Sequence, residues 1–110
     1  MIEVGSPFGS ATRTRVLLAL ELLGQSYPRE LGRLLGTPLS VVQKALRSLE
    51  RDAIVAARAI GRTRVYQLDP RYFAKNELRT FLARLLVADG DLKSRAASLR
   101  RRPRRTGKRL

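Results

Sequence analysis

The sequence predicts a single small domain that is mainly α-helical and contains one β-hairpin. Apolar residues recur at the three- and four-residue spacing of helices in four segments, three before residue 52 and one after residue 75. Between residues 53 and 68 the pattern changes to short runs rich in Val, Ile and Tyr around a glycine, which is typical of two paired strands. The length of 110 residues suits one domain.

The first element is an irregular lead-in, residues 1–9, which is followed by a helix. Ser10 or Thr12 can cap this helix, which we expect to run to about Leu23 and to end at Gly24. Apolar side chains surround nearly the whole helix, so other parts of the protein must cover it on most sides. In so short a chain, a partner subunit could provide part of that cover.

Two further helices follow, separated by a tight turn. The first begins near Pro28, because proline suits the first helical turn, and it ends at Gly36. The second has Thr37 as its N-cap and Pro38 at its first helical position, and we expect it to run to about Arg51.

The hairpin and one more helix complete the predicted domain, which spans residues 10–90. The two strands flank a turn at residues 61–63, and Asp69-Pro70 ends the second strand. A helix over residues 76–87 follows, and the sequence Asp89-Gly90-Asp91 ends it.

The charge of the chain is strongly positive and unevenly distributed. The 23 Lys and Arg residues outnumber the 9 Asp and Glu residues and give a formal net charge of +14. We expect residues 91–110 to form a basic, disordered tail, with a helix that could extend briefly before Pro103. This balance favours a polyanionic partner, nucleic acid first, although such a tail can also be a solubilising or targeting appendage. The tail cations are Arg100, Arg101, Arg102, Arg104, Arg105, Lys108 and Arg109.

The composition argues against several classes of function. The chain contains no histidine and no cysteine, so it lacks the commonest general base and the ligands of most transition-metal sites. The acidic pair Asp89 and Asp91 is better explained as a helix-ending turn than as a cation site. We therefore expect no enzyme activity, no metal and no cofactor. The N-terminus does not resemble a signal peptide and no apolar run is long enough to cross a membrane, so we expect a cytoplasmic protein without a membrane partner.

The helix over residues 38–51 separates its side chains into two faces. On a helical wheel, one face is apolar and suits the core: Val42, Ala45, Leu46 and Leu49. The opposite face carries side chains that can donate hydrogen bonds to base edges and phosphates: Ser40, Lys44, Arg47 and Arg51, with Val41, Gln43 and Ser48 at its margins. An ordinary solvated helix can show the same pattern.

The order of the predicted elements favours the second face as a DNA-reading surface. Three helices, a tight turn between the second and third, a basic hairpin and a final helix make a winged helix-turn-helix with a basic C-terminal tail. In this arrangement the wing, residues 58–64, lies on the DNA backbone or in the minor groove. Phosphate contacts are expected from Arg62, Arg64 and Arg29, and less so from Arg58.

The segments ELGRLLGTPLSVVQKALRSLERDAIV and ARAIGRTRVYQLDP resemble the ArsR-like winged-helix transcription regulators. Shared features are a Glu-Leu start, a Leu-Gly turn, a recognition helix ending in Leu, and a wing of the form GR…VY.L.P. The lead-in FGSATRTRVLLALELL is also similar to a winged-helix subgroup with FGS..TR before its first helix, some members of which are fused to a nucleotidyltransferase domain. The resemblance covers residues 8–86, and we expect no nucleotidyltransferase activity here.

The resemblance also implies which residues contact DNA. In the recognition helix they are Pro38, Leu39, Ser40, Val41, Gln43, Lys44 and Arg47, and in the wing they are Arg62 and Arg64. Leu39 and Val41 are apolar where the family usually has polar residues, which leaves contacts with thymine methyl groups. Ala53 stands where the family often has glycine, so the backbone there either avoids a positive φ or is strained.

The sequence therefore predicts a sequence-specific transcription regulator that binds double-stranded DNA. We expect a homodimer formed through the first and last helices, because both carry broad apolar surfaces. Two alternatives stay open. One is a winged-helix protein-interaction module or adaptor, which Leu39 and Val41 favour, and the other is a nonspecific nucleic-acid-binding protein driven by the Arg-rich tail.

Overall fold

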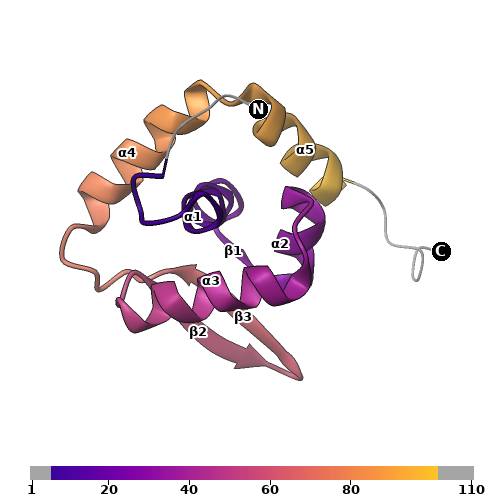
Figure 1. The fold of residues 1–110 in the computed structure, drawn as a ribbon, viewed down its shortest axis with the longest axis vertical. Coiled ribbons are helices and arrows are strands. Elements are labelled where there is room, and N and C mark those ends of the chain that lie inside the picture. Colours follow the sequence, from indigo (N-terminus) through magenta and orange to yellow (C-terminus); the bar gives the residue numbers. More distant parts are fainter. Residues whose placement is uncertain (1–5, 102–110) are drawn as a thin grey trace.

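The computed structural model describes residues 6–101 and shows a mainly helical molecule with a small antiparallel sheet (Figure 1). This confirms the mainly helical fold with a small β-hairpin that the sequence predicts, and the arrangement is compatible with a winged helix. In the part of the chain that is described, no helix has the length and apolarity needed to cross a membrane. The elements are, in order, α1 (Ala11–Leu23), β1 (Gln25–Ser26), α2 (Pro28–Leu35), α3 (Leu39–Arg51), β2 (Val55–Ile60), β3 (Thr63–Leu68), α4 (Lys75–Val87) and α5 (Gly90–Arg101).

Helix α1 lies at the centre of the molecule, and Figure 1 shows it end-on with the other helices and the sheet around it. Ser10 caps its start by accepting a hydrogen bond from the Arg13 backbone N–H at 3.1 Å, and Gly24 ends it, as predicted. Residues 16–20 are at most 1% exposed, because α2, α3, α4, α5 and β3 all contact α1. The same chain thus supplies the cover that the sequence attributed in part to a partner subunit.

The turn between α2 and α3 differs by one residue from the prediction. Pro28 begins α2 and Gly36 ends it in the left-handed conformation (φ 63°), as expected. The N-cap of α3 is Pro38, however, and not Thr37. The Thr37 N–H donates to the Gly32 carbonyl at 3.0 Å and its hydroxyl donates to the Leu35 carbonyl at 3.2 Å. Thr37 therefore completes the end of α2, and no side-chain hydrogen bond caps the start of α3.

The sheet contains the predicted hairpin and one strand that was not predicted. Strands β2 and β3 pair from Val55↔Leu68 to Ile60↔Thr63, around the turn at Gly61. The short strand β1 adds to the other edge of β3, which gives the order β1-β3-β2. Two residues are too few to show any alternation of polar and apolar side chains, so the sequence carries no signal for β1.

The backbone at Ala53 takes the conformation that usually requires glycine. After α3, the Ala53 N–H donates to the Glu50 carbonyl and the Ile54 N–H donates to the Leu49 carbonyl, both at 3.0 Å. This pair of bonds forms a Schellman motif, which needs a left-handed residue after the helix. Ala53 has φ 63°, so of the two possibilities open from the sequence, the strained backbone is the one found.

The prediction of a disordered tail from residue 91 is wrong for residues 91–101, which belong to α5. Asp89 accepts a hydrogen bond from the Leu92 N–H at 3.1 Å and so caps α5, while the turn it begins ends α4 as predicted. Leu92 (1% exposed) and Ala96 (3% exposed) pack into the core, because their four-residue spacing places them on one side of the helix. The many charged residues around Leu92 and Ala96 made this spacing hard to recognise in the sequence. Residues 102–110, with the predicted tail cations Arg102, Arg104, Arg105, Lys108 and Arg109, lie outside the described residues.

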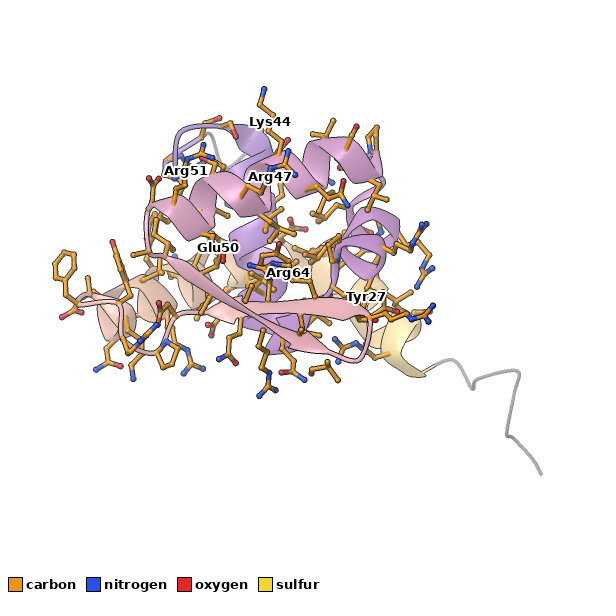
Figure 2. All side chains as sticks on the ribbon, turned by 90° about the horizontal axis from the view of Figure 1, so that it is seen from below. Tyr27, Lys44, Arg47, Glu50, Arg51 and Arg64 are labelled. Atoms are coloured by element: carbon orange, nitrogen blue, oxygen red, sulfur yellow. The ribbon has the colours of Figure 1, made fainter. Side chains whose placement is uncertain are left out.

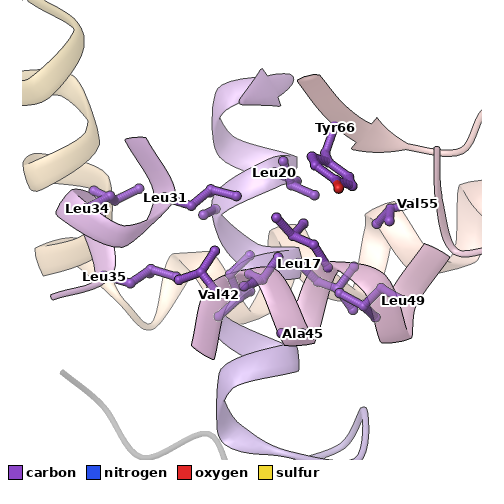
Figure 3. Packing of buried hydrophobic residues seen from close by; sticks show 14 of the residues in the cluster. Leu17, Leu20, Leu31, Leu34, Leu35, Val42, Ala45, Leu49, Val55 and Tyr66 are labelled. Atoms are coloured by element: carbon purple, nitrogen blue, oxygen red, sulfur yellow. The ribbon is translucent and has the colours of Figure 1, made fainter. Parts of the chain in front are cut away.

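One hydrophobic core joins these elements, and Figure 3 shows its packing around α1. Leu17 and Leu20 of α1 lie among side chains from α2, α3, β2 and β3, including Tyr66. The predicted core stripe of α3 is confirmed, since each member is at most 6% exposed: Val42, Ala45, Leu46 and Leu49.

Candidate nucleic-acid interface

The face of α3 opposite the core stripe is open to solvent. Because the stripe holds one side of the helix against α1, the other side must point outward. The exposed residues of this face are Pro38, Ser40, Val41, Gln43, Lys44, Arg47 and Arg51, while Leu39 and Ser48 are half-buried. Figure 2 shows Lys44 reaching beyond the ribbon of α3, with Arg47 and Arg51 farther along the same helix.

The two carboxylates near the end of α3 are both paired with arginines. Arg64 binds Glu50 with an N–O distance of 2.9 Å, and Arg13 binds Asp52 at 2.8 Å. By contrast, Lys44, Arg47 and Arg51 form no ion pair with any residue between 6 and 101. The outward face of α3 therefore carries three free positive charges and no free negative charge in this region.

The arginines predicted for the wing occupy three different positions. Arg62 lies in the hairpin turn and is exposed. Arg64 lies between the hairpin and α3 (Figure 2), where it also donates to the Tyr66 hydroxyl at 3.2 Å. This hydrogen bond, followed by the charge of Glu50, raises the pKa of Arg64, so its charge is firmly held. Arg58 points to the other face of the sheet and donates to Gln25 Oε1 at 3.0 Å.

Helix α2 adds two cations next to the start of α3, Arg29 in its first turn and Arg33 in its last turn. Arg29 was predicted and is exposed, and Arg33, one turn later, is also exposed. Both line a shallow hollow between α2 and α3 together with Gly32, Thr37 and Leu39. Sequence reasoning missed Arg33, although its four-residue spacing from Arg29 places both side chains on one side of α2.

Arg13 is a second residue that sequence reasoning missed. Its side chain is only 18% exposed. Its guanidinium donates to the Phe8 carbonyl at 2.6 Å, to the Ser48 hydroxyl, and to the Asp52 carboxylate at 2.8 Å. Arg13 thus fixes the end of α3 against the start of α1. The FGS..TR motif could have indicated this contact, because it contains Phe8, the capping residue Ser10 and Arg13 itself.

Arg100 was predicted as a cation of a free tail, and the structure assigns it a different place. It donates to both carboxylate oxygens of Glu30, at 2.7 and 2.8 Å, and to the Gln25 carbonyl at 2.8 Å. Glu30 is 7% exposed and also accepts a hydrogen bond from Ser26 at 2.6 Å. Burial by itself raises the pKa of Glu30, but the hydrogen bonds from Arg100 and Ser26 outweigh it and hold the pKa below 4.5. Arg100 therefore attaches α5 to α2 and β1.

The side chains around α3 were considered as a metal site, and the chain was compared with known proteins. Within residues 6–101, no three Asp, Glu, His or Cys side chains come together as a metal site would require. A search of protein-family models and of curated proteins found no match to this chain.

Proposed function

We propose that this protein is a winged-helix transcription regulator that binds specific sequences in double-stranded DNA. Helix α3 enters the major groove as the recognition helix, and the hairpin β2–β3 lies on the neighbouring backbone or in the minor groove as the wing. The chain order of α1, α2, α3 and the hairpin supports this assignment, since it matches that of a winged helix-turn-helix.

The charge on the outward face of α3 is the observation that carries the proposal. Lys44, Arg47 and Arg51 are exposed and free of ion pairs with residues 6–101, whereas the neighbouring Glu50 and Asp52 are neutralised. A helix of this width fits the major groove, and cations attract the phosphates on both sides of it. Ser40 and Gln43 on the same face can donate to base edges.

The surrounding cations fit the role of positioning contacts. Arg29 and Arg33 lie beside the start of α3, and Arg62 lies at the hairpin turn. Such contacts fix the register of the protein on the duplex without reading its sequence. Val41, with 41% of its surface exposed, is placed to contact thymine methyl groups rather than to form hydrogen bonds.

The proposal is tested by selecting bound fragments from a random DNA library at physiological salt and measuring affinities by fluorescence anisotropy. Lys44→Ala and Gln43→Ala should change the selected sequence, whereas Arg62→Ala should weaken all sequences alike. Each lost phosphate contact should reduce the slope of log affinity against log salt by about 0.9. Lys93→Ala is the matched control, because Lys93 is an exposed cation on α5, across α1 from α3 (Figure 1).

Two results would contradict the proposal. If the α3 variants bind DNA as Lys93→Ala does, α3 is not the reading helix. If no sequence is enriched and random fragments bind equally well, the protein is a nonspecific nucleic-acid binder.

The exposed apolar surface of Val41 favours a second candidate, a protein-interaction module. A partner captured on the α3 face should then survive nuclease and high salt, and Val41→Ser should release it while Lys44→Ala should not. Loss of the partner after nuclease treatment would contradict this candidate.

A further inference from the structure

A small hollow lies where the end of α1, the end of β3 and the start of α4 meet. Gly24 borders it after α1, Gln67 and Leu68 border it in β3, and Lys75 and Arg79 border it in α4. A Cβ atom added at Gly24 would meet no other atom within 4 Å, so the space beside this residue is open. The hollow has a volume of about 240 Å³. Pockets for drug-sized ligands are larger, about 300–1000 Å³, so this one suits a smaller molecule.

Backbone hydrogen bonds fix the wall between β3 and α4. The carboxylate of Asp69 accepts a hydrogen bond from the Arg71 N–H at 2.9 Å. The Tyr72 N–H donates to the Asp69 carbonyl and the Lys75 N–H donates to the Tyr72 carbonyl, both at 3.0 Å. These bonds run without a break from the turn into α4, so the hollow is already formed in the free protein, as is usual for ligand sites.

The side chains around the hollow carry one positive charge in excess. Glu21, whose side chain is only 13% exposed, accepts a hydrogen bond from Arg79 Nε at 3.0 Å. Lys75 lies one turn before Arg79 on the same side of α4 and forms no ion pair with any residue between 6 and 101. Cations at this spacing repel each other, and one carboxylate compensates only one of them. The end of α1 and the start of α4 carry opposite partial charges, which offset each other here. The hollow therefore attracts an anion.

The rest of the lining is largely apolar. Leu20, which is 1% exposed, lies beside Leu68 and Pro70 in the wall of the hollow. The side-chain amide of Gln67 adds a hydrogen-bond donor. Apolar walls with a few polar groups directed at one end are typical of small-molecule sites.

We propose that this hollow binds a small organic anion. Its carboxylate or phosphate group binds Lys75 and Arg79, with the Gln67 amide as a further donor, and its apolar part packs on Leu68 and Pro70. Hydrogen bonds between ionised groups of opposite sign are about twice as strong as neutral ones. An arginine has five N–H donors, so Arg79 can bind the anion while its ion pair within the chain persists. The inference does not require that the protein binds DNA, because none of these residues lies on α2, α3 or the hairpin turn.

Four anions test the two parts of the proposed ligand: benzoate, phenyl phosphate, acetate and inorganic phosphate. Amide chemical shifts of the isotope-labelled full chain report both affinity and location. Benzoate or phenyl phosphate should saturate one site, with the largest shifts around Gly24, Gln67 and Lys75, and the tighter of the two identifies the head group. That anion should bind at least about five times more tightly than its counterpart without a ring, because the ring buries apolar surface. Saturation by none of the anions, or equal affinity with and without the ring, would overturn the proposal.

Substitutions of Lys75 test the cation that has no partner. Lys75→Gln should raise the dissociation constant of the tighter anion at least about fivefold, because a charge-assisted hydrogen bond is lost. Lys75→Arg keeps the charge and should stay within about twofold of the natural protein. Lys93→Gln is the matched control, since Lys93 is an exposed cation on α5 away from the hollow, and it should have no effect. Equal dissociation constants for Lys75→Gln and Lys93→Gln would overturn the proposal. Circular dichroism of each variant shows that the fold is kept.

Discussion

Replacement of Ala53 by glycine should stabilise the protein, although it removes a side-chain atom and adds no contact. Ala53 is exposed and has φ 63°, so its methyl group contributes little burial and meets the steric conflict of the left-handed region. This conformation costs an L-residue about 1–2 kcal/mol, and glycine avoids that cost. Glycine also gains more conformational freedom in the unfolded chain, which offsets about 0.5–1 kcal/mol.

The net effect of Ala53→Gly should be an increase of about 0.5–1 kcal/mol in the free energy of unfolding. For a domain of this size, that corresponds to a rise of about 2–6 °C in the melting temperature. Thermal and urea unfolding followed by circular dichroism measure both quantities. The hydrogen bonds of the Schellman motif use backbone groups only, so the end of α3 should keep its structure.

Ala83→Gly is the matched control for this prediction. Ala83 is also exposed, but it lies inside α4 in ordinary helical geometry. There glycine has no strain to relieve and should cost about 1 kcal/mol. The two substitutions are chemically identical and should have opposite signs. If Ala53→Gly is neutral or destabilising while Ala83→Gly has its expected cost, the explanation by backbone strain is refuted.

Three further predictions concern the polar contacts that join the elements. The pKa of Glu30 is lowered, so the stability that its charge provides is present above about pH 4.5 and is lost as the pH falls through the lowered pKa. Glu30→Gln should therefore flatten this part of the plot of unfolding free energy against pH, measured by urea titrations at pH 3 to 7. Arg13→Gln should lower the unfolding free energy by about 1–3 kcal/mol in urea unfolding, because it leaves partly buried partners unsatisfied, and Arg29→Gln should have no comparable effect. Asp89→Ala should cost about 1 kcal/mol by removing the cap of α5, with Asp89→Asn retaining most of the stability; equal losses in thermal unfolding would contradict a capping role.

The sequence predicted well the features that depend on neighbouring residues. The α3 core stripe follows from four apolar residues at helical spacing, and all four are buried. The hairpin turn follows from Gly61, which has φ 63°. The two faces of α3 were therefore readable from local pattern, and so were most of the exposed residues of the candidate site.

The features that the sequence did not predict depend on contacts between distant residues. Arg13 binds Asp52, 39 positions later, and Arg100 binds Glu30, 70 positions earlier. A local pattern shows only that an arginine is charged, not which carboxylate it will meet after folding. For the same reason the prediction that Arg100 belongs to a free tail was wrong, and Arg64 is held by Glu50 rather than standing at the hairpin tip.

This division of the cations changes what the net charge implies about the proposed function. Among the described residues 6–101, six arginines form ion pairs: Arg13, Arg64, Arg71, Arg79, Arg95 and Arg100. Four of the pairs join different elements or link the end of α3 to its neighbours, so these charges stabilise the fold and are already partly compensated. A paired arginine brings less free charge to a polyanion than an unpaired one. If the proposed function is right, the slope of DNA affinity against salt should fall when a free cation of α3, α2 or the hairpin turn is removed. Reversal of the charge of a paired residue such as Arg79 should lower the stability of the fold more than it lowers the affinity for DNA.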